Sequence, residues 1–289
     1  MPIVQGDKVR HPKMLEWGIG KVLEVKSGGK IKVFFLNEGE KTIDQSYVQL
    51  EKIDGAGAKH PILDNPTFHE RAGKKGHRNL EDAKADFYRI YPQGFEDEGY
   101  FKEERTYKVE ACGLFKTLLN KDEYAQLLAA GDADEVVKRA LQVVNKTNLI
   151  FPNEKMGLKD GLKSAGDKKL FAERLYDLLY GGVEFNVRFE AFVECLEIIN
   201  AAKWPIATYF PYLAFPNEHM FLKPEITKNA TDLTHAELNY RSELNWLTYK
   251  SLLEFSTYLR DKLEQMEMKP RDMIDVQSFM WCIAPGKNN

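Results

Sequence analysis

Residues 6–53 alternate between apolar and polar side chains with the two-residue period of β-strands. The run 30–36 shows this most clearly, because one face collects bulky apolar side chains: Ile31, Val33 and Phe35. The opposite face of the same run holds Lys32 and Phe34. Further extended runs are expected on either side of it, at 9–11, 20–26, 41–43 and 47–53.

Short turns join these runs. Gly28-Gly29 allows positive φ at both central positions of a two-residue hairpin. Asn37-Glu38-Gly39 supplies the next turn. Short strands joined within about fifty residues can bury an apolar face only by curling into a small barrel. The N-terminal segment is therefore predicted to be an SH3-like barrel.

From residue 80 onward the apolar positions recur every three to four residues, which indicates amphipathic helices. Asp132 with Glu135 three residues later is an N-terminal capping signature. An aromatic segment starting near Pro205 is predicted to be a buried helix, bent or broken at Pro211. The other expected helices are 80–91, 100–120, 122–130, 132–145, 155–165, 167–180, 185–202, 225–235, 248–268 and 272–281. This half should form a compact irregular bundle.

Composition fits a folded chain with two domains. Of its 289 residues 43% are hydrophobic and 12% aromatic, which is enough for a sizeable core. The net charge of −3 argues against a protein that mainly wraps nucleic acid, because phosphate binding needs a basic face. Cys112, Cys195 and Cys282 are far apart and indicate neither a disulfide framework nor a metal site. No apolar run approaches the roughly 18 residues of a membrane span, so we expect a cytoplasmic protein.

Residues 6–53 also carry spaced motifs in a fixed order: GDKVRHP at 6–12, WGIGKV at 17–22, VFF at 33–35 and GEKTI at 39–43. In this order they resemble the Tudor-like domain at the C-terminus of the bacterial UvrD/PcrA repair helicases and related CarD-like modules. The helicase motor has no counterpart in the sequence. Residues 13–16 (KMLE) intervene before Trp17, where the helicase pattern is shorter, so the first loop is expected to be remodelled.

This resemblance implies protein binding, because the helicase module and the CarD-like modules dock on RNA polymerase. Phe34 shares its face with Lys32, and an outward aromatic residue beside lysines suits contact with a partner. Trp17 either joins this contact or plugs one end of the barrel. The residues predicted to bind the partner are Trp17, Lys32, Phe34, Lys41 and Tyr47.

The segment 55–79 is predicted to be a linker, because the small residues 54–58 (DGAGA) mark a domain boundary. Four basic residues lie close together near its end: Arg71, Lys74, Lys75 and Arg78. One interpretation is that they contact nucleic acid or an acidic partner. The other is a solvated linker, which is the commoner role of such a segment.

The P-loop, HExxH and GxSxG signatures of enzymes do not occur in the sequence. Three acidic pairs have the carboxylates that Mg²⁺ prefers: Glu103-Glu104, Asp132-Asp134 and Asp272-Asp275. Asp132 and Asp272 stand where helices start, so capping explains them better, and Glu103-Glu104 is expected on a solvated helix face. We name no catalytic residue, no metal ligand and no cofactor.

A second cluster mixes aromatic and polar residues around 221–228 and 241–249. Lys223 or Arg241 could bind an anion there, and Trp246 or Tyr249 could stack on a base. The alternative is that these aromatic residues belong to the core and only hydrogen-bond through their polar tips, which is the commoner role.

These patterns predict an α+β protein with a Tudor-like β-barrel at 1–54, a linker at 55–79 and an α-helical domain at 80–289. The predicted function is that of a non-enzymatic adaptor that docks on a protein partner, RNA polymerase or a DNA-repair helicase complex. The alternative is a nucleic-acid-binding protein, or a metal-dependent nucleic-acid enzyme component of a defence or mobile-element system. No membrane partner is expected.

Overall fold

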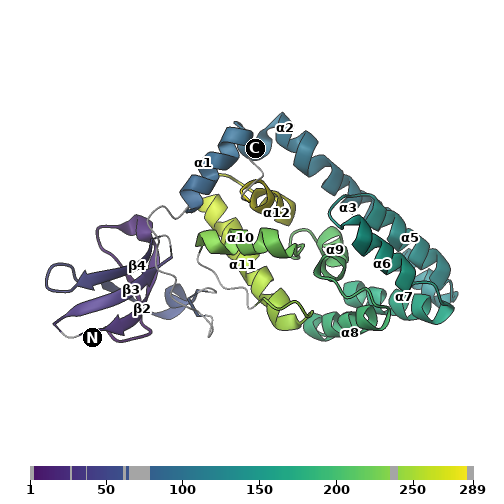
Figure 1. Cartoon of the computed structure of the whole chain (residues 1–289), viewed down its shortest axis with the longest axis horizontal. Helices are drawn as coiled ribbons and strands as arrows, with labels where there is room; N and C mark the ends of the chain where they lie inside the picture. The colour runs from purple at the N-terminus through teal and green to yellow at the C-terminus, as the bar shows by residue number, and fades with distance from the viewer. Residues whose placement is uncertain are drawn as a thin grey trace.

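The structure, a computed structural model, describes residues 3–26, 28–36, 38–60, 63–64, 79–234 and 240–284. An N-terminal antiparallel sheet of five strands is followed by a helical region, which confirms the predicted fold class (Figure 1). The strands are β1 (Lys8–Arg10), β2 (Ile19–Val25), β3 (Lys30–Phe35), β4 (Gly39–Asp44) and β5 (Glu51–Ile53). Their order across the sheet is β4-β3-β2-β1-β5, so the last strand returns beside the first.

The hairpins form at the predicted turns. Gly28 and Gly29 have φ values of 79° and 74°, as a turn with positive φ at both central positions requires. The last strand is shorter than the predicted run 47–53, because the amides of Tyr47 and Val48 donate to the carbonyl oxygen of Asp44 and form a turn. One face of the sheet encloses a small core: Val9, Val22, Ile31, Val33, Phe35, Ile43 and Leu50.

The opposite face of β3 packs against the rest of the molecule. Phe34 and Leu36 belong, with Leu23 and Leu63, to the same continuous apolar cluster as the core of the helical region. Alternate side chains of β3 therefore enter two different cores, one inside the sheet and one shared with the helices. The ion pair between Lys8 and Asp64 adds a polar contact between β1 and the segment that follows β5.

The helical region follows the predicted order. Its helices are α1 (Leu80–Ile90), α2 (Glu98–Tyr100), α3 (Thr106–Leu118), α4 (Lys121–Ala129), α5 (Ala133–Asn145), α6 (Pro152–Gly161), α7 (Ala165–Tyr180), α8 (Phe185–Ile198), α9 (Trp204–Ala214), α10 (Pro224–Thr234), α11 (Trp246–Gln265) and α12 (Met273–Cys282). A π-helical turn, η4 (Phe101–Arg105), joins α2 to α3 without a break. Short 3₁₀ turns occur at η1 (Leu15–Trp17), η2 (Gly55–Ala58) and η3 (Gly94–Glu96).

Several predicted helix boundaries are wrong, and the break considered at Pro211 does not occur. The helix predicted at 155–165 starts at Pro152, because the Glu154 carboxylate accepts a hydrogen bond from the Phe151 amide and caps an earlier turn. The helix predicted to reach residue 202 ends at Ile198, and Asn200 takes a left-handed φ of 54°. Pro211 does not break α9, which continues to Ala214.

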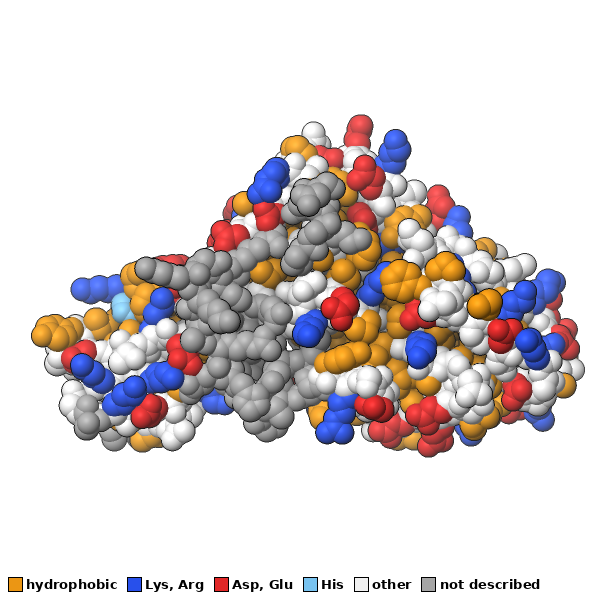
Figure 2. Space-filling view, in the orientation of Figure 1, with side chains coloured by type: hydrophobic (Ala, Val, Ile, Leu, Met, Phe, Trp, Pro, Cys, Tyr) orange, Lys and Arg blue, Asp and Glu red, His pale blue; other side chains and the backbone are white. Residues whose placement is uncertain are grey.

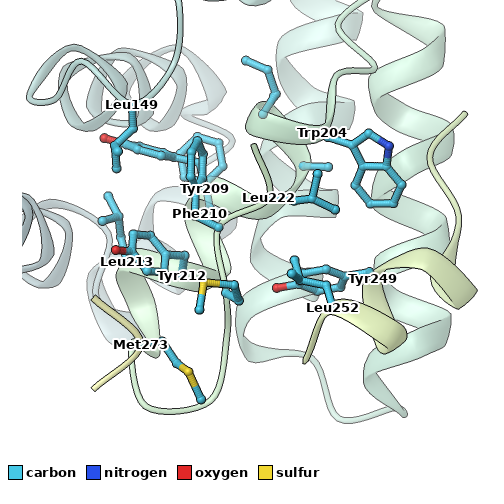
Figure 3. Close-up of a cluster of buried hydrophobic side chains, with 14 of the residues drawn as sticks. Leu149, Trp204, Tyr209, Phe210, Tyr212, Leu213, Leu222, Tyr249, Leu252 and Met273 are labelled. Carbon is cyan, nitrogen blue, oxygen red and sulfur yellow. The ribbon is translucent and has the colours of Figure 1, made fainter. Parts of the chain in front are cut away.

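The unbroken α9 lies at the centre of the helical core. Every one of its residues is buried, and Tyr209, Phe210, Tyr212 and Leu213 point into the cluster shown in Figure 3. The Tyr209 hydroxyl is hydrogen-bonded to the Thr147 hydroxyl and donates to the Val143 carbonyl oxygen. Packing on all sides therefore outweighs the backbone hydrogen bond that a proline removes.

Gly161 provides a test of the packing between α6 and α8. A methyl group there would lie 2.1 Å from the carbonyl oxygen of Ile199, whereas at Gly157 of the same helix it would meet open space. Gly161→Ala is expected to lower the free energy of unfolding by about 3 kcal/mol, and Gly157→Ala to raise it by about 1 kcal/mol. Urea denaturation of both variants measures this. Equal effects of the two substitutions would contradict the close approach.

Candidate functional site

A groove lies between the β domain and α11 in the described part of the chain. Its volume is about 910 Å³. One wall is formed by the β1–β2 side of the sheet, and the other by one face of α11. The residues that line it are Arg10, Leu15, Gly18, Ile19, Leu36, Lys59, His60, Leu253, Glu254, Thr257, Tyr258, Asp261, Lys262 and Gln265. Ligand sites are commonly found at such junctions between two structural units.

His60 and Tyr258 fix the two walls to each other. Their ring centroids lie 4.7 Å apart in an edge-to-face arrangement. The His60 amide donates to the carboxylate of Asp64, which also holds Lys8 of β1. Burial lowers the pKa of His60 to about 4, so its imidazole is neutral near pH 7. The floor of the groove is therefore an uncharged aromatic contact.

Charges of both signs surround this floor. Arg10 and Lys59 come from the β side, while Glu254, Asp261 and Lys262 come from α11. The Lys262 ammonium lies 5.7 Å from the ring centroid of Tyr258, and burial lowers its pKa. The groove thus combines an apolar floor with a mixed polar rim, as protein-binding surfaces commonly do.

The turn η1 leaves apolar side chains exposed at the mouth of the groove. It contains Leu15 and Glu16 of the segment 13–16 that precedes the Trp-Gly motif, and it ends at Trp17. Leu15 is 63% exposed and lines the groove, and Met14 beside it is 36% exposed. Exposed apolar residues next to one another are candidates for contact with another molecule.

Trp17 lies at the end of the same turn. Its ring packs 4.8 Å from His11 and 5.2 Å from Phe35 of the inner core, measured between ring centroids. The Lys41 ammonium lies 5.3 Å from the indole and forms an ion pair with Glu38. Trp17 is half-buried. It therefore contacts the inner core while part of its side chain stays exposed, with Lys41 over the ring.

The other predicted partner-binding residues lie apart from this turn. Phe34 is fully buried, so the prediction that it points outward is wrong. Periodicity placed Phe34 on the correct face of β3, but that face is covered by the helical region. Lys32 forms an ion pair with Glu40, 2.9 Å away, and Tyr47 is 87% exposed in the β4–β5 turn.

Among the described residues, those considered for metal binding form no assembled site. Arg71, Lys74, Lys75 and Arg78 lie outside the described residues. On the described part of the face in Figure 2, acidic and basic side chains are interspersed rather than separated by sign. Across the described ranges no group of three or more His, Cys, Asp or Glu residues is arranged to hold a metal ion.

The acidic pairs have local structural roles. Asp132 accepts a hydrogen bond from the Glu135 amide and caps α5, and Asp272 caps α12. Capping, the preferred interpretation of both residues, is confirmed. Glu104 differs from the expected solvated face, because it forms an ion pair with the buried Lys108.

The residues of the second aromatic cluster lie in two separate parts of the structure. Tyr249 is fully buried, and its ring stacks on Phe189 with centroids 4.7 Å apart. Trp246 packs beside it in the core. Lys223 lies elsewhere, between the rings of Phe151 and Trp281. The cleft considered for Lys223 with Trp246 or Tyr249 is therefore not formed. Arg241, the other residue considered for the anion, is exposed, and its carbonyl oxygen accepts a hydrogen bond from the Trp204 indole.

Sequence reasoning missed His60 and the whole α11 wall of the groove. Leu253, Tyr258 and Lys262 follow ordinary helical spacing, which does not distinguish a groove from a solvated face. The one available signal was the intervening segment 13–16, which places Met14 and Leu15 in a loop where apolar residues have no core to enter.

The comparisons with known proteins cover only the β domain. Residues 3–53 match a family model described as "Protein of unknown function (DUF3553)". This range ends with the last residue of β5, which agrees with a small N-terminal β domain. No curated protein and no solved structure matches the chain. In the part of the chain that the structure describes, no helix is both long and apolar enough to cross a bilayer.

Proposed function

We propose that this protein is a non-enzymatic adaptor that docks on a protein partner through its β domain. The resemblance of residues 6–53 to the Tudor-like module of repair helicases supports RNA polymerase or a repair helicase complex as that partner. The observation that carries the proposal is the apolar turn η1, whose Leu15 stands exposed at the mouth of the groove.

The proposed contact surface differs from the one expected from sequence. Phe34 is covered, so the surface consists of Met14, Leu15 and the exposed part of Trp17, with Lys41 beside it. A segment of the partner would place apolar side chains on the floor of the groove and polar groups on its rim. Since the floor is held between the sheet and α11, the adaptor needs both parts of the chain.

Leu15→Asp in the full chain is expected to weaken binding to purified bacterial RNA polymerase at least about ten-fold, because it places a charge in an apolar contact. Val25→Asp is the matched control: Val25 is also an exposed aliphatic residue, but it lies at the opposite end of β2 from the groove. Surface plasmon resonance on the immobilised chain measures both, with a purified UvrD-type helicase as a second analyte.

Equal loss in both variants would place the contact outside the groove. Binding of neither analyte to the unmodified chain would overturn this choice of partners. Circular dichroism of each variant confirms that the fold is retained, which is expected because both side chains are exposed.

A further inference from the structure

A separate and smaller pocket of about 330 Å³ lies within the helical region. It forms where the π-helical turn η4, the loop before α6, the residue preceding α10 and the last turns of α12 meet. Its size is at the lower end of the range of small-molecule sites. It shares no lining residue with the groove beside the β domain.

One wall of this pocket already holds an ammonium group. The Lys223 ammonium lies 4.2 Å from the ring centroid of Phe151 and 4.8 Å from that of Trp281. Aromatic faces attract cations electrostatically, most strongly for tryptophan. We call Phe151 and Trp281 the aromatic clamp. Lys223 shows which kind of chemical group the clamp accepts.

A second observation comes from α12. Gln277 lines the pocket and is only 2% exposed, yet its side-chain oxygen has no hydrogen-bond partner. A buried acceptor without a partner is unfavourable. The oxygen itself is covered in the structure, so a donor in the pocket reaches it when the Gln277 side chain turns toward the pocket. Gln277 lies four residues before Trp281 on one face of α12, so the acceptor and the clamp belong to the same wall.

The π-helical turn adds carboxylates to the pocket. Glu104 accepts a hydrogen bond of 2.9 Å from the buried Lys108, which also donates to the Ser278 hydroxyl. Burial lowers the pKa of Lys108, although the nearby Glu104 opposes this shift. Glu103 is exposed and accepts one hydrogen bond, from the Tyr91 hydroxyl at 3.1 Å. A carboxylate can accept several more.

We propose that this pocket binds a small organic ammonium ion, with the ligand's cation on the aromatic clamp in place of the Lys223 ammonium. Its N–H groups would donate to Glu103 and, after the Gln277 side chain turns toward the pocket, to the side-chain oxygen of Gln277. An anion fits less well, because Lys108 is already committed to Glu104 and Ser278. This inference does not depend on the adaptor function.

Isothermal titration calorimetry of the full chain with putrescine tests the proposal. Gln277→Leu keeps the side-chain volume and removes the unpaired oxygen, and it should weaken putrescine binding about ten-fold. Tetramethylammonium has no N–H group, so its affinity should not fall in this variant. Circular dichroism confirms folding, which is expected because the substitution removes an unpaired buried oxygen.

The Lys223→Met variant tests whether the pocket prefers a positively charged ligand. Removing the competing internal cation should tighten putrescine binding about three-fold or more. Lys250→Met, at an exposed position of α11 outside the pocket, controls for the change in net charge and should have no effect. Weaker putrescine binding in Lys223→Met, or no putrescine binding to the unmodified chain at millimolar concentration, would overturn the proposal.

Discussion

Asp275→Asn is expected to lower the free energy of unfolding by about 3–5 kcal/mol, which is the usual cost of breaking a buried ion pair by removing one partner. The Asp275 carboxylate is fully buried, and it accepts hydrogen bonds from the Tyr100 hydroxyl, the Arg105 guanidinium at 2.7 Å and the Arg271 amide at 2.8 Å. These donors belong to α2, η4 and the segment before α12. Loss of the Asp275 charge therefore weakens the contact through which these three segments are held together.

Arg105 makes this junction a closed network. It also pairs with Asp272, the residue that caps α12, at 2.8 Å. Burial alone would lower the pKa of Arg105, but the hydrogen bonds and charges of Asp272 and Asp275 hold it above its ordinary value. The guanidinium stays charged, so neutralising Asp275 leaves a buried cation with only one carboxylate.

Urea denaturation followed by circular dichroism measures the loss. Asp160→Asn is the matched control, because Asp160 forms a surface ion pair with Lys163 at 2.9 Å and both side chains are more than half exposed. Such pairs contribute about 0–1 kcal/mol. If Asp275→Asn cost no more than Asp160→Asn, the buried network would contribute little to stability.

Phe34→Ala is expected to lower the free energy of unfolding by about 3–5 kcal/mol, as truncation of a fully buried phenylalanine does. The cavity would open in the apolar cluster that the sheet shares with the helices. The β domain should therefore become less tightly coupled to the helical region, and the far-ultraviolet and tryptophan transitions should separate along the urea axis.

Tyr47→Ala provides the comparison for this variant. Sequence alone gave Phe34 and Tyr47 the same predicted role, but Tyr47 is 87% exposed, and its truncation should change stability by no more than about 0.5 kcal/mol. Similar, small losses in both variants would mean that the face of β3 bearing Phe34 is not a stabilising contact.

The order of the elements could be predicted from sequence because its signals are local. Period-two alternation located β3 and separated Ile31 from Phe34, and the glycine pair gave the hairpin turn. Asp132 and Asp272 were identified as caps from their positions before apolar helical runs. In each case the side chain and its partner lie within a few residues of each other, so the contact can be predicted from their spacing in the sequence.

The break considered at Pro211 does not occur, because the deciding interactions come from distant residues. A proline in a helix normally removes a hydrogen bond and bends or ends the helix. In α9 the neighbouring side chains bury every residue, and Tyr209 bonds to Thr147 and Val143 of another segment. A rule based on neighbouring residues includes the hydrogen bond that the proline removes, but it does not include the packing from distant segments that offsets this loss.

Local sequence patterns predicted the two parts of this protein, the two faces of β3 and the positions of most helix starts. These patterns could not show that Phe34 is covered, that Leu15 lies beside α11, or that Gln277 shares a pocket with Lys223. Periodicity shows which side chains share a face, whereas what covers that face depends on packing between segments far apart in the chain.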